Sequence, residues 1–299
     1  MAMTATLRPY RHGRDYEAIG RFLVETYATG GAHVNWMQPR WEYMHFHPLI
    51  ENVDLDTIGV WVDGGRIVAV AHPEHGPGRA YFQVRPGCEA LRPEMLAYAE
   101  RHLRGLRHGR RVLQVLINDR DTDFQRWASA VGYERLAHSE PMSVLPLGEG
   151  PGPIRLPAGF RLISLADDND LPRLTRLIWR GFDHGDEPPD DGLAERRLMQ
   201  SAPNYRRDLN IVAVAPDGTF ASYCGMWIEP AGRLAYVEPV CTDPAYRRRG
   251  LATAAITEGI RRCAAGGAAV ACVGSAQPVY LAMGFRPLYT SSLWQRIWT

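Results

Sequence analysis

The stretch DPAYRRRGLATAAI, residues 243–256, places three arginines and a glycine between a predicted strand and a predicted helix. The strand is LAYVEPVCT, residues 234–242, and the helix extends from about Leu251 to Ala264, where two glycines end it. Backbone N–H groups at the start of a helix have no intrahelical partners, and the helix dipole places positive charge there. Because glycine leaves this backbone uncovered, the stretch predicts a binding site for a phosphate.

The arginines of this stretch allow a different interpretation, a basic surface that binds nucleic acid. The chain has 34 Lys and Arg residues, all of them Arg, against 33 Asp and Glu residues, and its formal net charge is +1. Such a balance creates no general attraction to nucleic acid or to an anionic membrane. Aromatic residues are not interleaved with the arginines as they are in a nucleic-acid groove. We therefore expect neither nucleic acid nor a membrane as a partner.

Length and composition indicate a protein of two ordinary domains. The 299 residues are 45% hydrophobic and 22% charged, and no apolar run approaches the roughly 18 to 20 residues that span a bilayer. The N-terminal residues lack the apolar core of a signal peptide. The five cysteines are odd in number and lack metal-ligand spacing. We therefore expect a cytoplasmic protein with reduced thiols, no disulfide and no metal.

The chain repeats its own pattern about half its length further on. Three features recur in the same order. They are a short strand followed by an amphipathic helix, a hairpin with an Asp-Gly-type turn, and a last strand that begins with a glycine and an aromatic residue. The matched pairs are residues 7–27 with 160–182, 58–71 with 211–224, and 130–142 with 282–294. A Pro- and Gly-rich stretch separates the copies. We predict two α/β domains, residues 1–147 and 158–299, joined by a linker at 148–157.

The arginine–glycine stretch resembles the pyrophosphate loop of the GNAT (Gcn5-related) N-acetyltransferase superfamily. Arg247 to Ala252 fit the pattern of that loop, [Q/R]-x-x-G-x-[G/A]. The stretch contains neither of two better-known phosphate-binding patterns, G-x-x-x-x-G-K-[ST] and G-x-G-x-x-G. The segment AQPVYLAMGF, residues 276–285, is similar to the family helix that carries an acidic tyrosine near the coenzyme A thiol. The Asn that often begins this segment in the family is absent. The resemblance covers nearly the whole second half.

This resemblance implies two tandem GNAT-like domains, each a mixed, mostly antiparallel sheet flanked by helices. It implies an N-acetyltransferase that uses acetyl-CoA and transfers the acetyl group directly to a primary amine in a ternary complex. The coenzyme would contact one strand end and the loop that follows it. The residues concerned are Val240, Cys241, Thr242, Arg247, Arg248, Arg249, Gly250, Leu251, Ala252 and Thr253. Whether the protein is a monomer or a homodimer is left open.

Pro239 predicts a bulge or an edge in its strand, because proline cannot donate a ladder hydrogen bond. A bulge would free the N–H of Val240 to hold the developing oxyanion, and the N–H of Thr242 would pair with the pantetheine arm. If strand alternation continues through the bulge, Glu238 shares a face with these two residues and serves as the general base. The alternative is a structural carboxylate paired with an arginine. By the same alternation Cys241 faces away, which disfavours a covalent acetyl-cysteine.

Tyr280 is the candidate general acid. The resemblance implies that it protonates the departing thiolate, four residues before Gly284 in the family segment. Spacing alone is equally compatible with a tyrosine that packs in the core.

The first half keeps the strand and the helix of this site but not the loop. Residues 81–103 contain no [R]-x-x-G-x-[G/A] pattern, and Pro93 removes a backbone donor near the helix start. The position that matches Tyr280 is Ala128. We therefore predict a degenerate GNAT-like domain that serves as a scaffold or as a wall of the substrate site.

Residues 35–50 of the first half are rich in aromatics and histidine. In the family this segment commonly borders the acceptor; the alternative is inter-domain packing by Trp36, Trp41 and Tyr43. His45 and His47 are two apart, on one side of a predicted strand, and lack a third metal ligand.

An acidic segment, residues 181–192, follows the first helix of the second half. Its carboxylates would attract a cationic small-molecule amine, or they form a solvated loop. They are Asp183, Asp186, Glu187, Asp190 and Asp191. Three rival functions stay open: an acyl-CoA-binding or regulatory protein without catalysis, an acetyltransferase for a peptide or protein amine, and a nucleic-acid binder.

Overall fold

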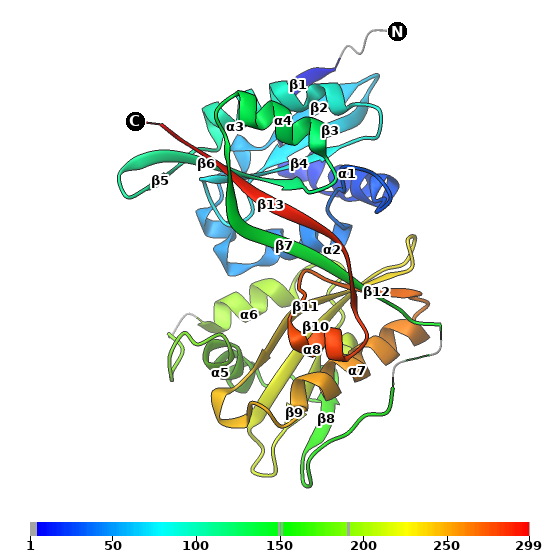
Figure 1. Cartoon of the computed structure of the whole chain (residues 1–299). Helices are drawn as coiled ribbons and strands as arrows, with labels where there is room; N and C mark the ends of the chain where they lie inside the picture. The colour runs from blue at the N-terminus through cyan, green and yellow to red at the C-terminus, as the bar shows by residue number, and fades with distance from the viewer. Residues whose placement is uncertain (1–4, 149, 151, 190–191, 299) are drawn as a thin grey trace. The chain divides into compact units, whose positions relative to one another are not determined.

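The computed structural model describes residues 5–148, 150, 152–189 and 192–298, and its contacts divide the chain into two compact units (Figure 1). The N-terminal unit comprises residues 1–141 together with 288–299, and the C-terminal unit comprises residues 142–287. The predicted boundaries at 148–157 assigned the last twelve residues to the second domain. The contacts assign them to the first unit, because the final strand pairs there.

The N-terminal unit is built on a mixed, mostly antiparallel sheet. Its strand order is β1-β2-β3-β4-β6-β13, with β5 paired to β6, and β4 with β6 is a parallel pair. The strands are β1 (Thr6–Pro9), β2 (Gly59–Asp63), β3 (Arg66–His72), β4 (Arg79–Val84), β5 (Gly105–Arg107), β6 (Arg110–Asn118) and β13 (Arg286–Trp298). The first hairpin has Gly64 and Gly65 in its turn, both with positive φ, as the Asp-Gly-type pattern predicts.

Helices cover both faces of this sheet. One buried cluster joins α1 (His12–Thr26) and α2 (Gln38–Phe46) to Val60 and Val70, and the other joins α3 (Arg92–His102) and α4 (Thr122–Ala130) to Trp61 and Ala69. Residues that alternate along β2 and β3 therefore serve opposite faces. The Asp121 carboxylate caps α4 by accepting from the Phe124 N–H at 3.2 Å.

The C-terminal unit repeats this architecture. Its strand order is β7-β12-β11-β10-β9-β8, with β11 and β12 parallel and the other pairs antiparallel. The strands are β7 (Glu134–Pro146), β8 (Arg161–Ser164), β9 (Ile211–Val214), β10 (Phe220–Glu229), β11 (Leu234–Thr242) and β12 (Val270–Val273). The mixed, mostly antiparallel sheet predicted for both halves is confirmed.

The helices of the C-terminal unit also lie on both faces. They are α5 (Leu171–Gly181), α6 (Gly192–Gln200), α7 (Leu251–Ala265) and α8 (Pro278–Ala282). Leu174 and Leu177 of α5 pack against Val212 and Val214, whereas Ile256 and Ile260 of α7 belong to the cluster around Ile211. Alternation along β9 therefore separates the two helices.

The last strand of each sheet comes from an unexpected segment. Residues 291–298 of β13 pair with residues 111–118 of β6, and residues 143–146 of β7 pair with residues 270–273 of β12. Each sheet is thus completed by chain that the sequence repeat assigns to the other copy. Pairing of this kind covers a strand edge that would otherwise expose its N–H and C=O groups.

The aromatic segment of the first half differs from its prediction. His45 lies on the helix α2 and His47 follows the helix end, so the two do not share a strand face. Trp36 and Trp41 pack in the buried core of the N-terminal unit itself, with Trp41 fully buried. His45 Nδ1–H donates to the Trp41 carbonyl at 2.9 Å, and its Nε2 accepts from the Tyr10 hydroxyl at 3.2 Å. Burial lowers the pKa of His45 to about 3.

No helix among the described residues has the length and apolar character to cross a membrane.

Candidate active site

β11 carries the bulge that Pro239 predicts. Cys224 of β10 opposes Val240 and Met226 opposes Val237, so the single residue Gly225 faces the two residues Glu238 and Pro239. A side chain at Gly225 would place its Cβ 2.6 Å from the Glu238 carbonyl oxygen. Only glycine therefore permits this close approach of the two strands.

Beyond the bulge, β11 presents backbone donors on its β12 side. The parallel pairing of β11 with β12 covers residues 234–236 and 270–272, and no further pair joins these strands in the described chain. The Asp243 N–H donates to the Ala221 carbonyl of β10 at 3.0 Å. Since successive N–H groups of a strand point to opposite sides, those of Thr242 and Val240 are directed away from β10.

The bulge also changes which side chains share a face. Val237 and Val240 are three residues apart, yet both pack with the buried cluster under α7. Regular alternation therefore does not hold across Glu238 and Pro239. The expectation that Glu238 shares a face with Val240 and Thr242 required unbroken alternation, and the strand does not meet this condition. The Glu238 carbonyl accepts from Trp227 Nε1 at 3.0 Å.

The loop after β11 arranges its backbone for an anion. Arg248 and Gly250 both have positive φ, +61° and +79°, and α7 begins at Leu251. Ala254 N–H donates to the Gly250 carbonyl at 3.0 Å, the first α-helical bond of α7. The N–H groups of residues 251–253 precede that bond and are therefore available to a ligand. Loops in which residues with right-handed and left-handed backbone conformations alternate form anion-binding nests, and the helix dipole adds to the attraction of an anion.

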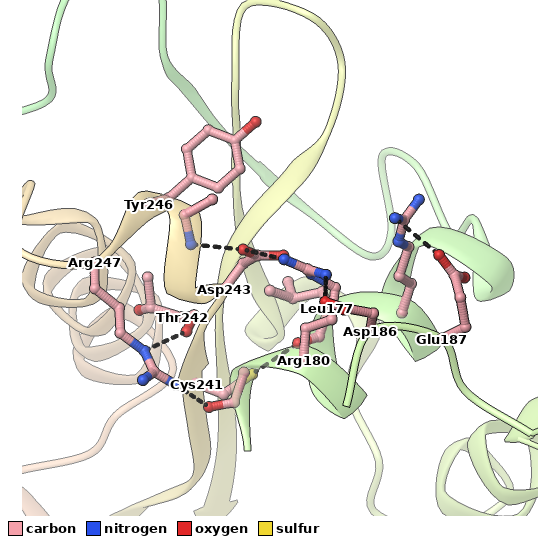
Figure 2. A network of polar contacts seen from close by, with 12 residues as sticks. Leu177, Arg180, Asp186, Glu187, Cys241, Thr242, Asp243, Tyr246 and Arg247 are labelled. Atoms are coloured by element: carbon pink, nitrogen blue, oxygen red, sulfur yellow. Dashed lines mark hydrogen bonds and ion pairs between the residues drawn. The ribbon is translucent and has the colours of Figure 1, made fainter. Parts of the chain in front are cut away.

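Two of the three arginine side chains of this loop, those of Arg247 and Arg249, contact the protein. Arg247 donates from Nε to the Thr242 carbonyl at 3.2 Å and from Nη2 to the Gly181 carbonyl at 3.1 Å and the Asp183 carboxylate at 2.8 Å. Arg249 lies with its guanidinium carbon 5.6 Å from the Tyr246 ring centre. Arg247 thus ties the loop to Gly181 at the end of α5 and, as Figure 2 shows, to Thr242 at the end of β11.

A second tie joins α5 to the same loop. Arg180 donates from Nε to the Asp243 carboxylate at 2.6 Å, and the Ala245 N–H donates to that carboxylate at 2.9 Å (Figure 2). Burial alone raises the pKa of Asp243, but the hydrogen bonds from Arg180 and Ala245 outweigh it and hold the pKa below its usual range. The sequence reasoning missed Arg180, because nothing in the sequence pairs it with a residue 63 positions later.

The acidic segment after α5 is paired with arginines. Asp183 pairs with Arg247, Asp186 with Arg180, and Glu187 with Arg176 at 3.0 Å. These pairs neutralise much of the negative charge that was expected to attract a cationic amine. The predicted residues Asp190 and Asp191 lie outside the described residues.

Tyr280 lies on α8 within the buried cluster that contains Cys224 and Val237. Its ring meets the Phe285 ring edge-on at 5.8 Å, and its side chain is 7% exposed. Burial, then the nearby Cys224 and Glu238, raise the pKa of Tyr280 well above its usual value. The hydroxyl is therefore protonated at neutral pH, as a general acid requires.

Cys241 faces α5, opposite to the α7 cluster. Its Sγ lies 3.9 Å from the Leu177 carbonyl oxygen, and a Cβ on Gly181 would come within 2.8 Å of the Cys241 Cβ. Burial raises the pKa of this thiol to about 12. A thiolate nucleophile is therefore disfavoured at this position.

Comparison with known proteins agrees with this geometry. Residues 171–285 match the model of the acetyltransferase (GNAT) family. A GCN5-related N-acetyltransferase from Sphaerobacter thermophilus is 17% identical with a TM-score of 0.67, over 98% of this chain and 95% of that one. A tandem GNAT protein from the clavulanic acid biosynthesis pathway is 17% identical with a TM-score of 0.69, over 98% of each chain.

A more distant likeness in fold is also found. N-myristoyltransferase of Saccharomyces cerevisiae, solved with bound myristoyl-CoA, is 10% identical with a TM-score of 0.59, over 100% of this chain and 80% of that one. At such identities the likeness concerns the fold. No curated protein matches the sequence.

Proposed function

We propose that this chain is a tandem member of the GNAT acetyltransferase family and that its C-terminal unit acetylates a primary amine of a small molecule with acetyl-CoA. The observation that carries the proposal is the junction of β11 and α7. At this junction, the N–H groups of Val240 and Thr242 and the first N–H groups of α7 have no backbone acceptor among the described residues. A thioester arm that ends in a pyrophosphate needs donors at both places.

The transfer proceeds in one complex without an acyl-enzyme. The neutral amine attacks the thioester carbonyl carbon, and the Val240 N–H holds the oxygen that becomes negative. The C–S bond then breaks, and Tyr280 gives its proton to the departing sulfur. Glu238 is not placed there by strand alternation, but its charge acts on Tyr280, and in the proposal it accepts the proton of the amine, directly or through a water molecule. The buried, protonated Cys241 takes no part, because its thiol faces α5.

The choice of a small molecule as the acceptor follows the protein of similar fold described as a tandem GNAT protein from the clavulanic acid biosynthesis pathway. The pairing of Asp183, Asp186 and Glu187 with arginines shifts the expected recognition of the amine from these carboxylates to Glu238.

Release of free thiol from acetyl-CoA tests the proposal. The full chain is incubated with acetyl-CoA and a panel of small amines, and with peptides as a second panel. Turnover on a small amine supports the proposal. Turnover on peptides alone would show that the acceptor is a protein or peptide amine. Tight CoA binding with no turnover on either panel would identify a non-catalytic CoA-binding protein.

The role of Glu238 has its own test. Glu238→Gln is expected to lower kcat by about 10²-fold and to remove the acidic limb of the pH–rate profile, because the base is lost. An unchanged pH profile with lowered thermal stability would instead assign Glu238 a structural role.

A further inference from the structure

In the N-terminal unit, the strand end that corresponds to the coenzyme site is occupied by a side chain. β4 of the N-terminal unit corresponds to β11 of the C-terminal unit by its place in the sheet. β4 pairs in parallel with β6, as β11 pairs in parallel with β12. The Val84 N–H donates to Asn35 Oδ1 at 2.8 Å, and Asn35 Nδ2 donates to the Val84 carbonyl at 2.9 Å. Asn35 is 3% exposed and is held by Thr26 as well. A coenzyme arm therefore cannot pair with Val84.

A pocket of about 460 Å³ nevertheless remains beside Asn35. It lies between the end of β4, the start of α3 and the helix α4, all within the N-terminal unit. Its volume is in the range of sites that bind small molecules. The apolar part of its wall includes Phe124 and Trp127, whose rings are stacked with centres 5.9 Å apart and an interplanar angle of 11°. Such a wall suits a planar or apolar body.

The charged lining of this pocket is unsuited to a phosphate. It contains one arginine and three carboxylates, namely Arg92, Glu89, Asp121 and Asp123. Arg92 pairs with Asp121 at 2.5 Å, with side chains that are 8% and 4% exposed. His33 completes the polar lining; burial, then Arg92, lowers its pKa to about 4, so it is neutral at pH 7. Asp121 is paired with Arg92 and Asp123 with Arg126, so the excess negative charge of the lining is that of Glu89, which disfavours an anionic ligand.

Two polar atoms of the lining residues point to the ligand's chemistry. Arg92 Nε and Asp121 Oδ2, which belong to one ion pair, are both buried and have no hydrogen-bond partner among the described residues, although the pair balances its own charge. A buried donor without a partner is costly, and a ligand oxygen removes that cost. A second carboxylate would place two anions on one guanidinium, whereas an uncharged carbonyl oxygen accepts the bond without added charge.

We propose that the N-terminal unit binds a small, uncharged molecule with an aromatic or apolar body, whose carbonyl oxygen accepts a hydrogen bond from Arg92 Nε. The body of the molecule lies against Phe124 and Trp127. This site is independent of the proposed acetyl transfer, because it uses none of the residues of the C-terminal unit. It gives the degenerate copy a ligand-binding role in place of the lost coenzyme site.

Three probes that share a phenyl ring test the proposal on the full chain. They are benzamide, benzoate and toluene, and their binding is measured by ligand-observed NMR titration. Benzamide is expected to bind saturably, with benzoate and toluene each weaker by about tenfold, since one buried hydrogen bond accounts for a factor of this size. Ala90→Trp, a substitution at an exposed wall residue, is expected to weaken benzamide by at least the same factor. Added CoA is expected to leave benzamide binding unchanged.

Arg92→Lys separates the hydrogen bond from the ion pair. Lysine keeps a cation for Asp121 but has no Nε–H in that place, so the preference for benzamide over toluene is expected to disappear while toluene still binds. The Arg92 guanidinium carbon lies 5.3 Å from the centre of the Phe124 ring. Arg173→Lys is the matched control, because Arg173 likewise lies over a phenylalanine and pairs with aspartates, in the other unit. Benzoate binding as tightly as benzamide, or an unchanged preference in Arg92→Lys, would overturn the proposal.

Discussion

The Arg180 guanidinium and the Asp243 carboxylate, 2.6 Å apart, join the last turn of α5 to the first residue after β11 (Figure 2). Asp243 begins the turn that leads into the phosphate loop and accepts the Ala245 N–H there. Arg180 also pairs with Asp186 of the acidic segment. The helix before the acceptor segment and the loop that would hold the coenzyme are thus braced by one buried carboxylate.

Removing Arg180 therefore has a defined cost. Arg180→Met leaves the Asp243 carboxylate, 7% exposed, without its cation, and we expect a larger loss in the free energy of unfolding than at an exposed ion pair of the same helix. Arg176→Met is the matched control on the same helix; its pair with Glu187 is exposed, so we expect a loss below about 0.5 kcal/mol. Urea unfolding of both variants measures the difference. Equal losses would show that the brace contributes nothing.

The same brace predicts a pH dependence. The folded pKa of Asp243 lies below its unfolded value, so its contribution is fully present above the ordinary Asp pKa of about 3.9 and is lost as the pH falls through the folded pKa. The stability difference between the wild type and Arg180→Met is expected to be constant from pH 7 to about 5 and to shrink below about 4. A difference that stays constant down to the acid transition would refute the assignment.

Gly250 is expected to be essential for CoA affinity. Gly250→Glu places a side chain and a negative charge where the pyrophosphate would lie, and its positive φ adds strain. Gly267→Glu is the control at the other end of α7; that glycine also has positive φ, and an added Cβ meets nothing within 4 Å at either site. Calorimetry with CoA is expected to show at least a tenfold weaker Kd for Gly250→Glu alone. Similar affinities in both variants would place the phosphate elsewhere.

Tyr280→Phe isolates the proposed acid. Removing the hydroxyl is expected to lower kcat by about 10²-fold while CoA binding stays unchanged. Tyr246→Phe is the control beside the loop, since its hydroxyl reaches only Asp217, at 3.4 Å. Because the pKa of Tyr280 is raised by burial, the wild-type rate is expected to show no alkaline decline from this group below about pH 10. Full activity of Tyr280→Phe would show that Tyr280 only packs in the core and is not the general acid.

Asn35 is expected to stabilise the N-terminal unit. Asn35→Leu leaves the buried Val84 N–H and C=O without partners, and each such group costs about 1 to 3 kcal/mol. Asn52→Leu, at an exposed position of the same unit, is expected to change stability by less than about 0.5 kcal/mol. Thermal unfolding compares the two variants, and an unaffected Asn35→Leu would show that Val84 needs no partner.

Much of the fold was predictable because local signals repeat. The hairpin turns at Gly64–Gly65 and Gly218, the helix that begins at Leu251 and the bulge at Pro239 each depend on the backbone preferences of one or two residues. The two copies then made a tandem α/β fold the economical interpretation. The helix α2 was missed, because its aromatic residues are typical of strands and tertiary packing decided otherwise.

By itself, the sequence determined most of the elements, their order and the backbone shape of the predicted phosphate loop, since glycine, proline and hydrophobic period act over a few residues. Only the tertiary structure decided which strand completes each sheet, because strand pairing between residues 291–298 and 111–118 carries no local signal. It also decided the partners of the charged groups. Arg180 meets Asp243, and Asn35 takes the place of a coenzyme at Val84, through contacts between residues that only folding brings together.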